Sequence, residues 1–117
     1  MNTHTLIYLS LAVLAFIILK RLLGGSKVAT SIVKQKLESG ATIVDVRTPE
    51  EFRDGAYPGA QNIPLSDLGR RMTEIPKDKP VVLYCASGAR SSSAARAMKQ
   101  AGYADVINAG GLADMPR

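Results

Sequence analysis

Residues 83–91 read LYCASGARS, and this stretch decides the fold because it joins an apolar strand to a helix. Cys85 follows the predicted strand 81–84, and the predicted helix begins at about Arg90. The loop between them consists of four small residues, Ala86, Ser87, Gly88 and Ala89. Ligands of open α/β sheets bind at the carboxyl ends of strands, so this loop is also the first candidate site.

The loop has the residues needed to stabilise a thiolate. A loop that turns into a helix N-terminus directs several backbone N–H groups inward, and the helix dipole adds positive potential. Such a nest of amides stabilises a Cys85 thiolate and an anion attached to it. Gly88 leaves room for the backbone to curl, and Arg90 adds a positive charge. Taken alone, the loop is equally compatible with a small buried cysteine that has no chemical role.

The segments on either side of the loop alternate between strand and helix. Strands are predicted at 42–46, 61–63, 81–84 and 106–107, and helices at 31–37, 48–54, 64–75 and 90–100. Thr48 as N-cap, Pro49 at the first position and Glu51 at the capping-box position predict the start of the second helix. Ser66 is the predicted cap of the third helix. This alternation predicts an α/β fold with a small parallel sheet flanked by helices.

Length and composition exclude several classes of protein. The chain has 117 residues, enough for one small domain. A single cysteine excludes an intramolecular disulfide framework. The only histidine, His4, precedes a long apolar run, so neither a Cys/His metal cluster nor a Cys-His or Ser-His-Asp arrangement is expected. We therefore expect no metal and no cofactor, and chemistry that relies on Cys85, charged side chains, hydroxyls and backbone amides.

The net charge of +5 is confined to the N-terminal part of the chain. Every acidic residue lies at Glu38 or later, and the excess of basic residues precedes that position. The rest of the chain is neutral, which argues against a nucleic-acid partner.

Residues 6–19 form an uncharged apolar run that is followed by Lys20 and Arg21. A cleaved signal peptide would carry basic residues before its apolar run, and a buried core helix is the other alternative. As a helix, residues 5–19 would extend about 22 Å, short of the hydrocarbon thickness of about 30 Å. The extension to 2–23 would close this gap if Lys20 and Arg21 reach the headgroups. We predict a transmembrane anchor at 1–23.

The anchor prediction implies a domain organisation and a location. A short linker is predicted at 24–30 and the α/β domain at 31–117. The positive-inside rule places this domain on the cytoplasmic side of the inner or plasma membrane, as a single-pass protein with lipid as one partner. An unpaired cysteine in the domain suits that reducing compartment.

Four segments, taken in order, resemble single-domain rhodaneses, a family of sulfurtransferases. They are Asp45-Val46-Arg47 with TPEEF at 48–52, GAYPGAQNIP at 55–64, Cys85-x-x-Gly88-x-Arg90, and Gly110-Gly111. The resemblance covers residues 28–115 and implies a rhodanese-like fold. It also implies that a Cys85 thiolate takes the outer sulfur of thiosulfate or a persulfide and passes it to a thiol or cyanide.

The resemblance assigns roles to the candidate residues. Cys85 is the expected catalytic residue, and the expected substrate-binding residues are Ala86, Ser87, Gly88, Ala89 and Arg90. Asp45 and Arg47 are expected to support the site, as a structural ion pair or through loop hydrogen bonds, rather than to take part in catalysis. The expected partners are a small sulfur donor or a protein persulfide, and a thiol acceptor.

Two other functions stay open at this point. A cysteine phosphatase or arsenate reductase would carry its arginine after five intervening residues, where Ser91 stands, whereas Arg90 follows only four. The shorter loop suits one sulfur atom better than a tetrahedral oxyanion. The second alternative is a membrane-tethered rhodanese-like module that binds partners or carries sulfur. The combination of Cys85, Gly88 and Arg90 favours an active site over such a module.

Overall fold

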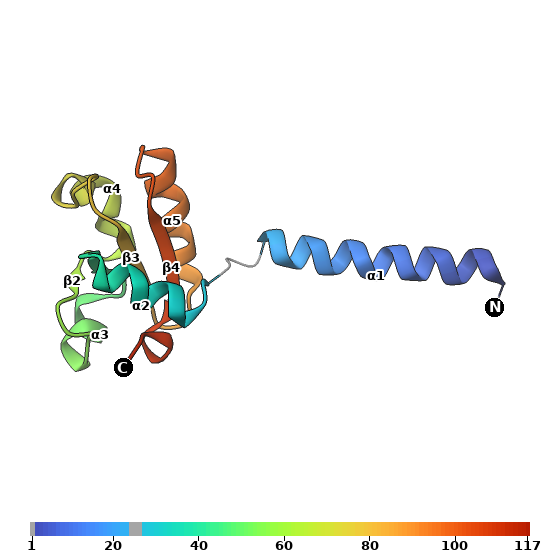
Figure 1. Cartoon of the computed structure of the whole chain (residues 1–117), viewed down its shortest axis with the longest axis horizontal. Coiled ribbons are helices and arrows are strands. Elements are labelled where there is room, and N and C mark those ends of the chain that lie inside the picture. Colours follow the sequence, from blue (N-terminus) through green and yellow to red (C-terminus); the bar gives the residue numbers. More distant parts are fainter. Residues whose placement is uncertain (1, 24–26) are drawn as a thin grey trace.

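The computed structural model describes residues 2–23 and 27–117 of the chain. Its regular elements are α1 (Thr3–Leu23), α2 (Thr30–Glu38), β1 (Thr42–Asp45), α3 (Pro49–Asp54), β2 (Gln61–Asn62), α4 (Leu68–Arg71), β3 (Val81–Cys85), α5 (Ala89–Gln100) and β4 (Val106–Gly111). Three 3₁₀ turns lie at Leu65–Asp67, Met72–Glu74 and Leu112–Asp114. The elements from α2 onward form one α/β domain, and α1 lies apart from it (Figure 1).

The sheet is parallel throughout, with the strand order β2-β1-β3-β4. Val44 of β1 lies opposite Leu83 of β3, and Leu83 lies opposite Asn108 of β4. All five residues of the central strand β3 are buried, as expected for a strand that is covered on both faces. The predicted parallel sheet flanked by helices is therefore confirmed.

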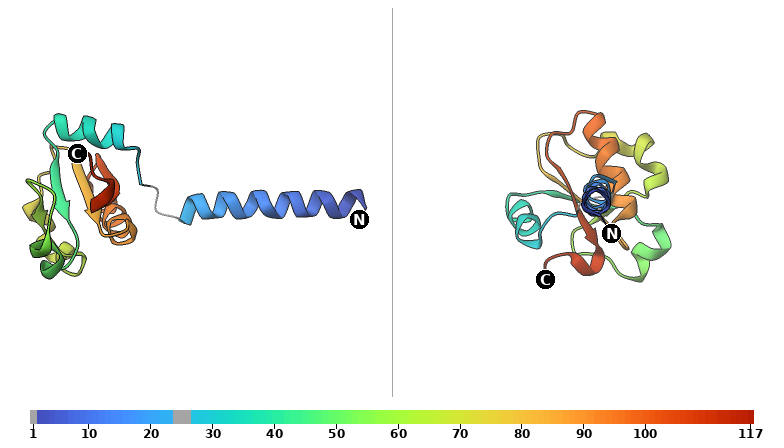
Figure 2. Two further views of the ribbon diagram at one scale, coloured as in Figure 1. Left: turned by 90° about the horizontal axis from the view of Figure 1, so that it is seen from below. Right: turned by 90° about the vertical axis from the view of Figure 1, so that its right-hand side faces the viewer.

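Alternate side chains of β3 enter two separate apolar clusters. Val81, Leu83 and Cys85 pack in the cluster that includes Ala94 and Met98 of α5. Val82 and Tyr84 pack in the cluster on the other face, which includes Val33 of α2. Figure 2 shows α2 and α5 on opposite sides of the sheet. Because successive strand residues point to opposite faces, Cys85 lies on the α5 side at the carboxyl end of β3.

The predicted start of α3 is confirmed in detail. Thr48 Oγ1 accepts a hydrogen bond from the Glu51 amide at 3.2 Å, and Glu51 Oε1 accepts one from the Thr48 amide at 3.2 Å. This reciprocal capping box satisfies two N–H groups that the helix itself leaves unpaired. It also holds the Glu51 side chain over the first turn of α3.

The helix predicted within 64–75 is present but much shorter than expected, and its predicted cap is wrong. This segment folds as the short α4 between two 3₁₀ turns, and Ser66 caps none of the three helical pieces. Gly69 lowers the helix propensity in the middle of the segment. At its end, Tyr103 Oη lies 2.8 Å from the Met72 carbonyl and 2.6 Å from the Ile75 carbonyl, which favours a tight turn over a longer helix.

The last strand is longer than the predicted 106–107. β4 continues to Gly111, which pairs with Cys85 after an irregularity in the β3–β4 ladder. The two glycines of the predicted motif therefore belong to the sheet and lie beside the candidate site.

The N-terminal segment differs from its prediction in one respect. In the described ranges, no helix is long and apolar enough to cross a membrane, so the transmembrane anchor predicted at 1–23 is not supported. The uncharged run at 5–19 extends only about 22 Å as a helix, against a hydrocarbon core of about 30 Å. Residues 24–26 of the predicted linker lie outside the described part of the chain.

Candidate active site

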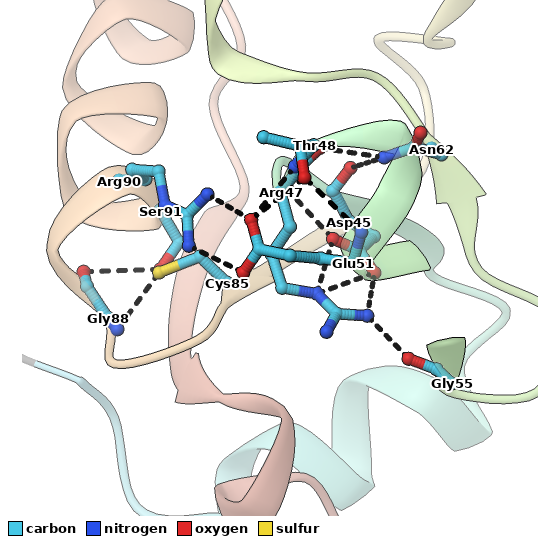
Figure 3. A network of polar contacts seen from close by, with 10 residues as sticks. All are labelled: Asp45, Arg47, Thr48, Glu51, Gly55, Asn62, Cys85, Gly88, Arg90 and Ser91. Atoms are coloured by element: carbon cyan, nitrogen blue, oxygen red, sulfur yellow. Dashed lines mark hydrogen bonds and ion pairs between the residues drawn. The ribbon is translucent and has the colours of Figure 1, made fainter. Parts of the chain in front are cut away.

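Cys85 is the last residue of β3 and lies beneath the loop that leads into α5. Its exposed fraction is 1%, and its Sγ accepts a hydrogen bond from the Gly88 amide at 2.9 Å. Ser91 Oγ lies 3.4 Å from the same sulfur (Figure 3). Gly88 has a φ of 101°, a left-handed conformation that turns its amide back toward the sulfur and that other residues rarely adopt. The sulfur is thus held by donors from its own loop and from α5.

The paired glycines of β4, Gly110 and Gly111, pack directly against this loop. A Cβ atom on Gly111 would overlap the carbonyl oxygen of Ala86, so only glycine allows the strand to approach the loop this closely. A Cβ atom on Gly88 would lie 3.3 Å from the Cα atom of Gly110. The Gly110-Gly111 pair in the sequence is therefore explained by close packing of backbone against backbone.

A buried polar network behind the sulfur connects α5 to β4. Ser91 Oγ lies 2.6 Å from Asn108 Oδ1, which also accepts a hydrogen bond from the Gly110 amide at 2.9 Å. Asn108 Nδ2 donates to the Gly88 carbonyl at 3.2 Å. Ser91 and Asn108 are 0% and 5% exposed, so the network is shielded from water. It orients the Ser91 hydroxyl and holds the loop in place.

These contacts allow the Cys85 thiol to ionise more readily than an ordinary buried cysteine. Burial raises the pKa of its thiol, but hydrogen bonds from the Ser91 hydroxyl and from the amides of Ser91, Gly88 and Ser87 more than compensate. The net effect is a lowered pKa of the Cys85 thiol. A lower pKa increases the fraction of the nucleophilic thiolate near neutral pH.

Arg90 is engaged in an ion pair that bridges two parts of the site. Its guanidinium donates to both carboxylate oxygens of Glu51, with Nη1···Oε1 at 2.7 Å and Nη2···Oε2 at 3.0 Å. Hydrogen bonds from Arg90 and from the Thr48 amide lower the pKa of Glu51 to about 2. The pKa of Arg90 is raised, first by Glu51 and to a lesser degree by the nearby Cys85. The helix α3 and the cysteine loop are therefore joined through two opposite charges.

Asp45 and Arg47 form the expected structural ion pair. Arg47 Nη2 donates to Asp45 Oδ2 at 2.7 Å and to the Gly55 carbonyl at 2.7 Å. The Arg47 guanidinium also lies over the ring of Tyr84, 5.6 Å from its centroid. Asn62 Nδ2 donates to the carbonyls of Asp45 and Arg47, at 3.0 Å each. These contacts tie β1, the end of α3 and β2 together, and none of them reaches the Cys85 sulfur.

The remaining predicted residues lie on the outer side of the loop. Ala86, Ser87 and Ala89 are exposed, and their small side chains leave the loop uncovered. The Gly88 amide donates to Sγ directly, whereas the side chain of Arg90 is directed to Glu51. The structure thus brings the predicted loop residues together around Cys85 and places Asp45 and Arg47 in a supporting network.

Sequence reasoning missed three residues of the site: Glu51, Ser91 and Asn108. Glu51 was predicted only as a capping residue, although a side chain that folds back over a helix start can also face the neighbouring loop. The position of Ser91 could have indicated its role, because it lies in the first turn of a helix that starts beside the cysteine. The sequence indicates the role of Asn108 less clearly, as a polar residue in an otherwise apolar strand.

A hollow of about 350 Å³ adjoins Arg90. Its lining residues come from the segments after β1 and β2 and from α5: Val46, Thr48, Pro64, Leu65, Ser66 and Arg90. Arg90 is the only charged residue among them. The arrangement can therefore offer a nucleophilic sulfur, a nest of amide donors and an adjoining, mainly apolar surface.

Comparison with known proteins assigns the chain to a family. The model of the rhodanese-like domain matches residues 29–114, which is most of the chain. The chain therefore belongs to the rhodanese-like domain family, and the predicted rhodanese-like fold is confirmed.

Relatives and solved structures of this family include sulfurtransferases. A sulfurtransferase of Allochromatium vinosum is 48% identical over 66 residues, which are 56% of this chain and 62% of that protein. The thiosulfate sulfurtransferase PspE of Escherichia coli (strain K12) is 40% identical over 74 residues, which are 62% of this chain and 71% of that protein. The structure of the human single-domain sulfurtransferase TSTD1 matches with a TM-score of 0.62 and 31% identity, over 73% of this chain and 88% of that one.

Proposed function

We propose that this chain is a sulfurtransferase that carries a sulfane sulfur as a persulfide on Cys85. The observation that carries the proposal is the environment of the sulfur: Sγ accepts the Gly88 amide at 2.9 Å, and its loop lowers the pKa of the thiol. A persulfide anion extends one atom beyond Sγ, toward the exposed loop of small residues. The sulfurtransferases among the relatives support the same reaction class.

The first half-reaction loads the sulfur. The Cys85 thiolate attacks the outer sulfur of the donor, and a new S–S bond forms at Cys85. With thiosulfate, the original S–S bond breaks and its electron pair leaves on sulfite. The product is a Cys85 persulfide anion, which the amide donors of the loop stabilise by hydrogen bonding. With a persulfide donor, the leaving group is the donor's thiolate.

The second half-reaction passes the sulfur on. Cyanide or an acceptor thiolate attacks the outer sulfur of the persulfide, and the S–S bond at Cys85 breaks. Its electron pair returns to Cys85 as a thiolate, while the acceptor becomes thiocyanate or a new persulfide. The sequence has no second cysteine that could take the sulfur within the chain, so the acceptor is another molecule.

The geometry favours sulfur transfer over phosphatase chemistry. A phosphatase loop needs a guanidinium that is free to bind the oxygens of a phosphoryl group. Here Nη1 and Nη2 of Arg90 each donate to a carboxylate oxygen of Glu51, so the charge of this guanidinium is already paired. A binding or carrier module without turnover is the second candidate, and a lowered thiol pKa is unnecessary for that role.

Turnover with cyanide tests the proposal. The full chain is incubated with thiosulfate or with an organic persulfide, and thiocyanate is measured after cyanide is added. We expect thiocyanate from the wild type and none above background from Cys85→Ser, which retains the shape of the side chain. Persulfide formation without turnover would favour a carrier module. Hydrolysis of an aryl phosphate that disappears in Cys85→Ser would favour a phosphatase.

We also propose that α1 holds the domain at a membrane, with the domain on the cytoplasmic side. The support is chemical: large apolar side chains between Leu6 and Leu19 are exposed, and burial in lipid removes such surface from water. Cell fractionation should find the full chain with membranes and a chain lacking residues 2–23 in the supernatant. Extraction with alkaline carbonate then separates a peripheral from an integral attachment. A full chain in the supernatant would refute the proposal.

A further inference from the structure

We propose that Glu51 determines the donor preference of the Cys85 site. By neutralising Arg90, it favours donors with one negative charge and an apolar group beside the transferable sulfur over dianionic thiosulfate. This inference rests on the proposed sulfur transfer and adds to it the class of donor. It depends on two features of the site, its charge and the shape of its surroundings.

The charge of Arg90 is already balanced in the folded protein. The two guanidinium nitrogens lie 2.7 and 3.0 Å from the two carboxylate oxygens of Glu51, in a bidentate arrangement that joins the edges of the two planar groups. The two side chains are similarly half-exposed, at 35% and 34%. A donor that approaches Cys85 therefore meets a neutral pair rather than a free cation.

Among the described residues, the other positive charges near the site are also paired. The side chain of Lys27 approaches Gly110, and its Nζ is bound to Asp114 at 3.0 Å. The neighbouring side chains of the loop, Ala86, Ser87 and Ala89, are uncharged. The second guanidinium in Figure 3, that of Arg47, is bound to Asp45 and to the Gly55 carbonyl. Thiosulfate, with a charge of −2, would thus lose hydration at this site without gaining a charge-assisted bond to an unpaired guanidinium, which is unfavourable.

The hollow beside Arg90 favours donors that carry an apolar group. Its volume of about 350 Å³ lies in the range of small-molecule sites. Val46, Pro64 and Leu65 supply an apolar wall, and the rest of the lining is Thr48, Ser66 and Arg90 itself. An aromatic or aliphatic group attached to the donor sulfur would remove this surface from water.

Two donors with the same reactive sulfur test the combined preference. Benzenethiosulfonate carries one negative charge and a phenyl ring, whereas thiosulfate carries two charges and no apolar group. In both cases the Cys85 thiolate attacks the terminal sulfur and the bond between the two sulfurs breaks. Its electron pair leaves on benzenesulfinate or on sulfite. Cyanide as common acceptor gives thiocyanate with either donor.

The decisive variant is Glu51→Gln, compared with Glu50→Gln as a matched control. Glutamine still serves at the capping-box position, so α3 keeps its start. Glu50 lies on the same helix with a side chain that is 71% exposed, and its replacement changes the net charge equally. We expect the wild type to use benzenethiosulfonate with the higher kcat/KM. In Glu51→Gln the kcat/KM for thiosulfate should rise by about fivefold to tenfold, mainly through KM, and by a larger factor than the kcat/KM for the singly charged benzenethiosulfonate.

A second variant leaves the ion pair untouched. Ser66 is exposed at the edge of the hollow, so Ser66→Lys adds a cation without disturbing the core. It should also shift the preference toward thiosulfate.

The inference fails if the wild type prefers thiosulfate, or if both variants leave the ratio of the two kcat/KM values unchanged. An equal fall for both donors in Glu51→Gln would limit Glu51 to a structural role and also overturn the inference. If the wild type forms thiocyanate from neither donor, it is the proposed function itself that fails.

Discussion

Replacement of Asp45 by asparagine should destabilise the domain because it leaves a buried guanidinium without its counter-ion. Asp45 is 0% exposed and the side chain of Arg47 is 8% exposed. The carboxylate accepts from Arg47 Nη2 at 2.7 Å, from Nε at 3.0 Å and from the Arg47 amide at 2.9 Å. Asparagine has the same shape but keeps only one of the two acceptor oxygens and no charge.

The expected loss follows from the burial of the pair. Removal of one partner of a buried ion pair costs about 3 to 5 kcal/mol, since the other charge stays buried and unpaired. Arg47 retains the Gly55 carbonyl at 2.7 Å and the ring of Tyr84, so we expect the lower end, about 3 kcal/mol. Small domains unfold with a total free energy of about 5 to 15 kcal/mol, so Asp45→Asn should still fold but be clearly less stable.

Urea unfolding of the full chain, followed by far-ultraviolet circular dichroism, measures this loss. Arg47→Met removes the other charge, and the double variant Asp45→Asn/Arg47→Met removes both. The double variant should lose less free energy of unfolding than the sum of the two single losses, by about 2 kcal/mol or more. Losses that add within about 0.5 kcal/mol would show that the two charges do not depend on each other and would refute the reasoning.

Three further predictions concern the cysteine loop. Ser91→Ala removes the hydroxyl that lies 3.4 Å from Sγ and lowers the thiol pKa, so the pKa of the Cys85 thiol should rise and the pH profile of iodoacetamide alkylation should move to higher pH; an unchanged profile would contradict this. Gly111→Ala forces a Cβ against the loop carbonyl, so transfer to cyanide should fall at least tenfold in a chain that still folds, as judged by circular dichroism. The pKa of Glu51 is lowered from 4.5 to about 2, so its pairing with Arg90 stabilises the domain above pH 4.5 and loses that effect as the pH falls toward 2. Glu51→Gln should therefore unfold at lower urea than the wild type at neutral pH, with the gap closing below pH 4.5.

Local signals in the sequence predicted much of the fold. Alternating strand and helix patterns are short-range features, and they predicted the parallel sheet that the structure confirms. The capping box at Thr48 and Glu51 was predictable because its partners are three residues apart. The helix predicted within 64–75 is shorter than expected. Its length depends on Tyr103, a residue far along the chain whose hydroxyl bonds to the carbonyls at the end of this segment.

The candidate site was predictable where it follows from one loop and unpredictable where it needs contacts between elements. The Cys85 sulfur and the Gly88 amide are three residues apart, and their hydrogen bond follows from the turn itself. The Arg90–Glu51 pair joins residues 39 positions apart, from two different helices. Helix propensity and residue spacing do not predict which distant residues come into contact. The sequence therefore could not predict that Glu51 neutralises the charge of Arg90 at the site.

Intact-mass spectrometry of the full chain tests the central claim most directly. Purified protein is treated with thiosulfate, benzenethiosulfonate or an organic persulfide, freed of the donor and measured at once. The account predicts a gain of the mass of one sulfur atom, located at Cys85 by peptide mapping, removed by dithiothreitol or cyanide and absent from Cys85→Ser. A wild type that gains no sulfur from any of the three donors, or that gains it equally in Cys85→Ser, would contradict the account.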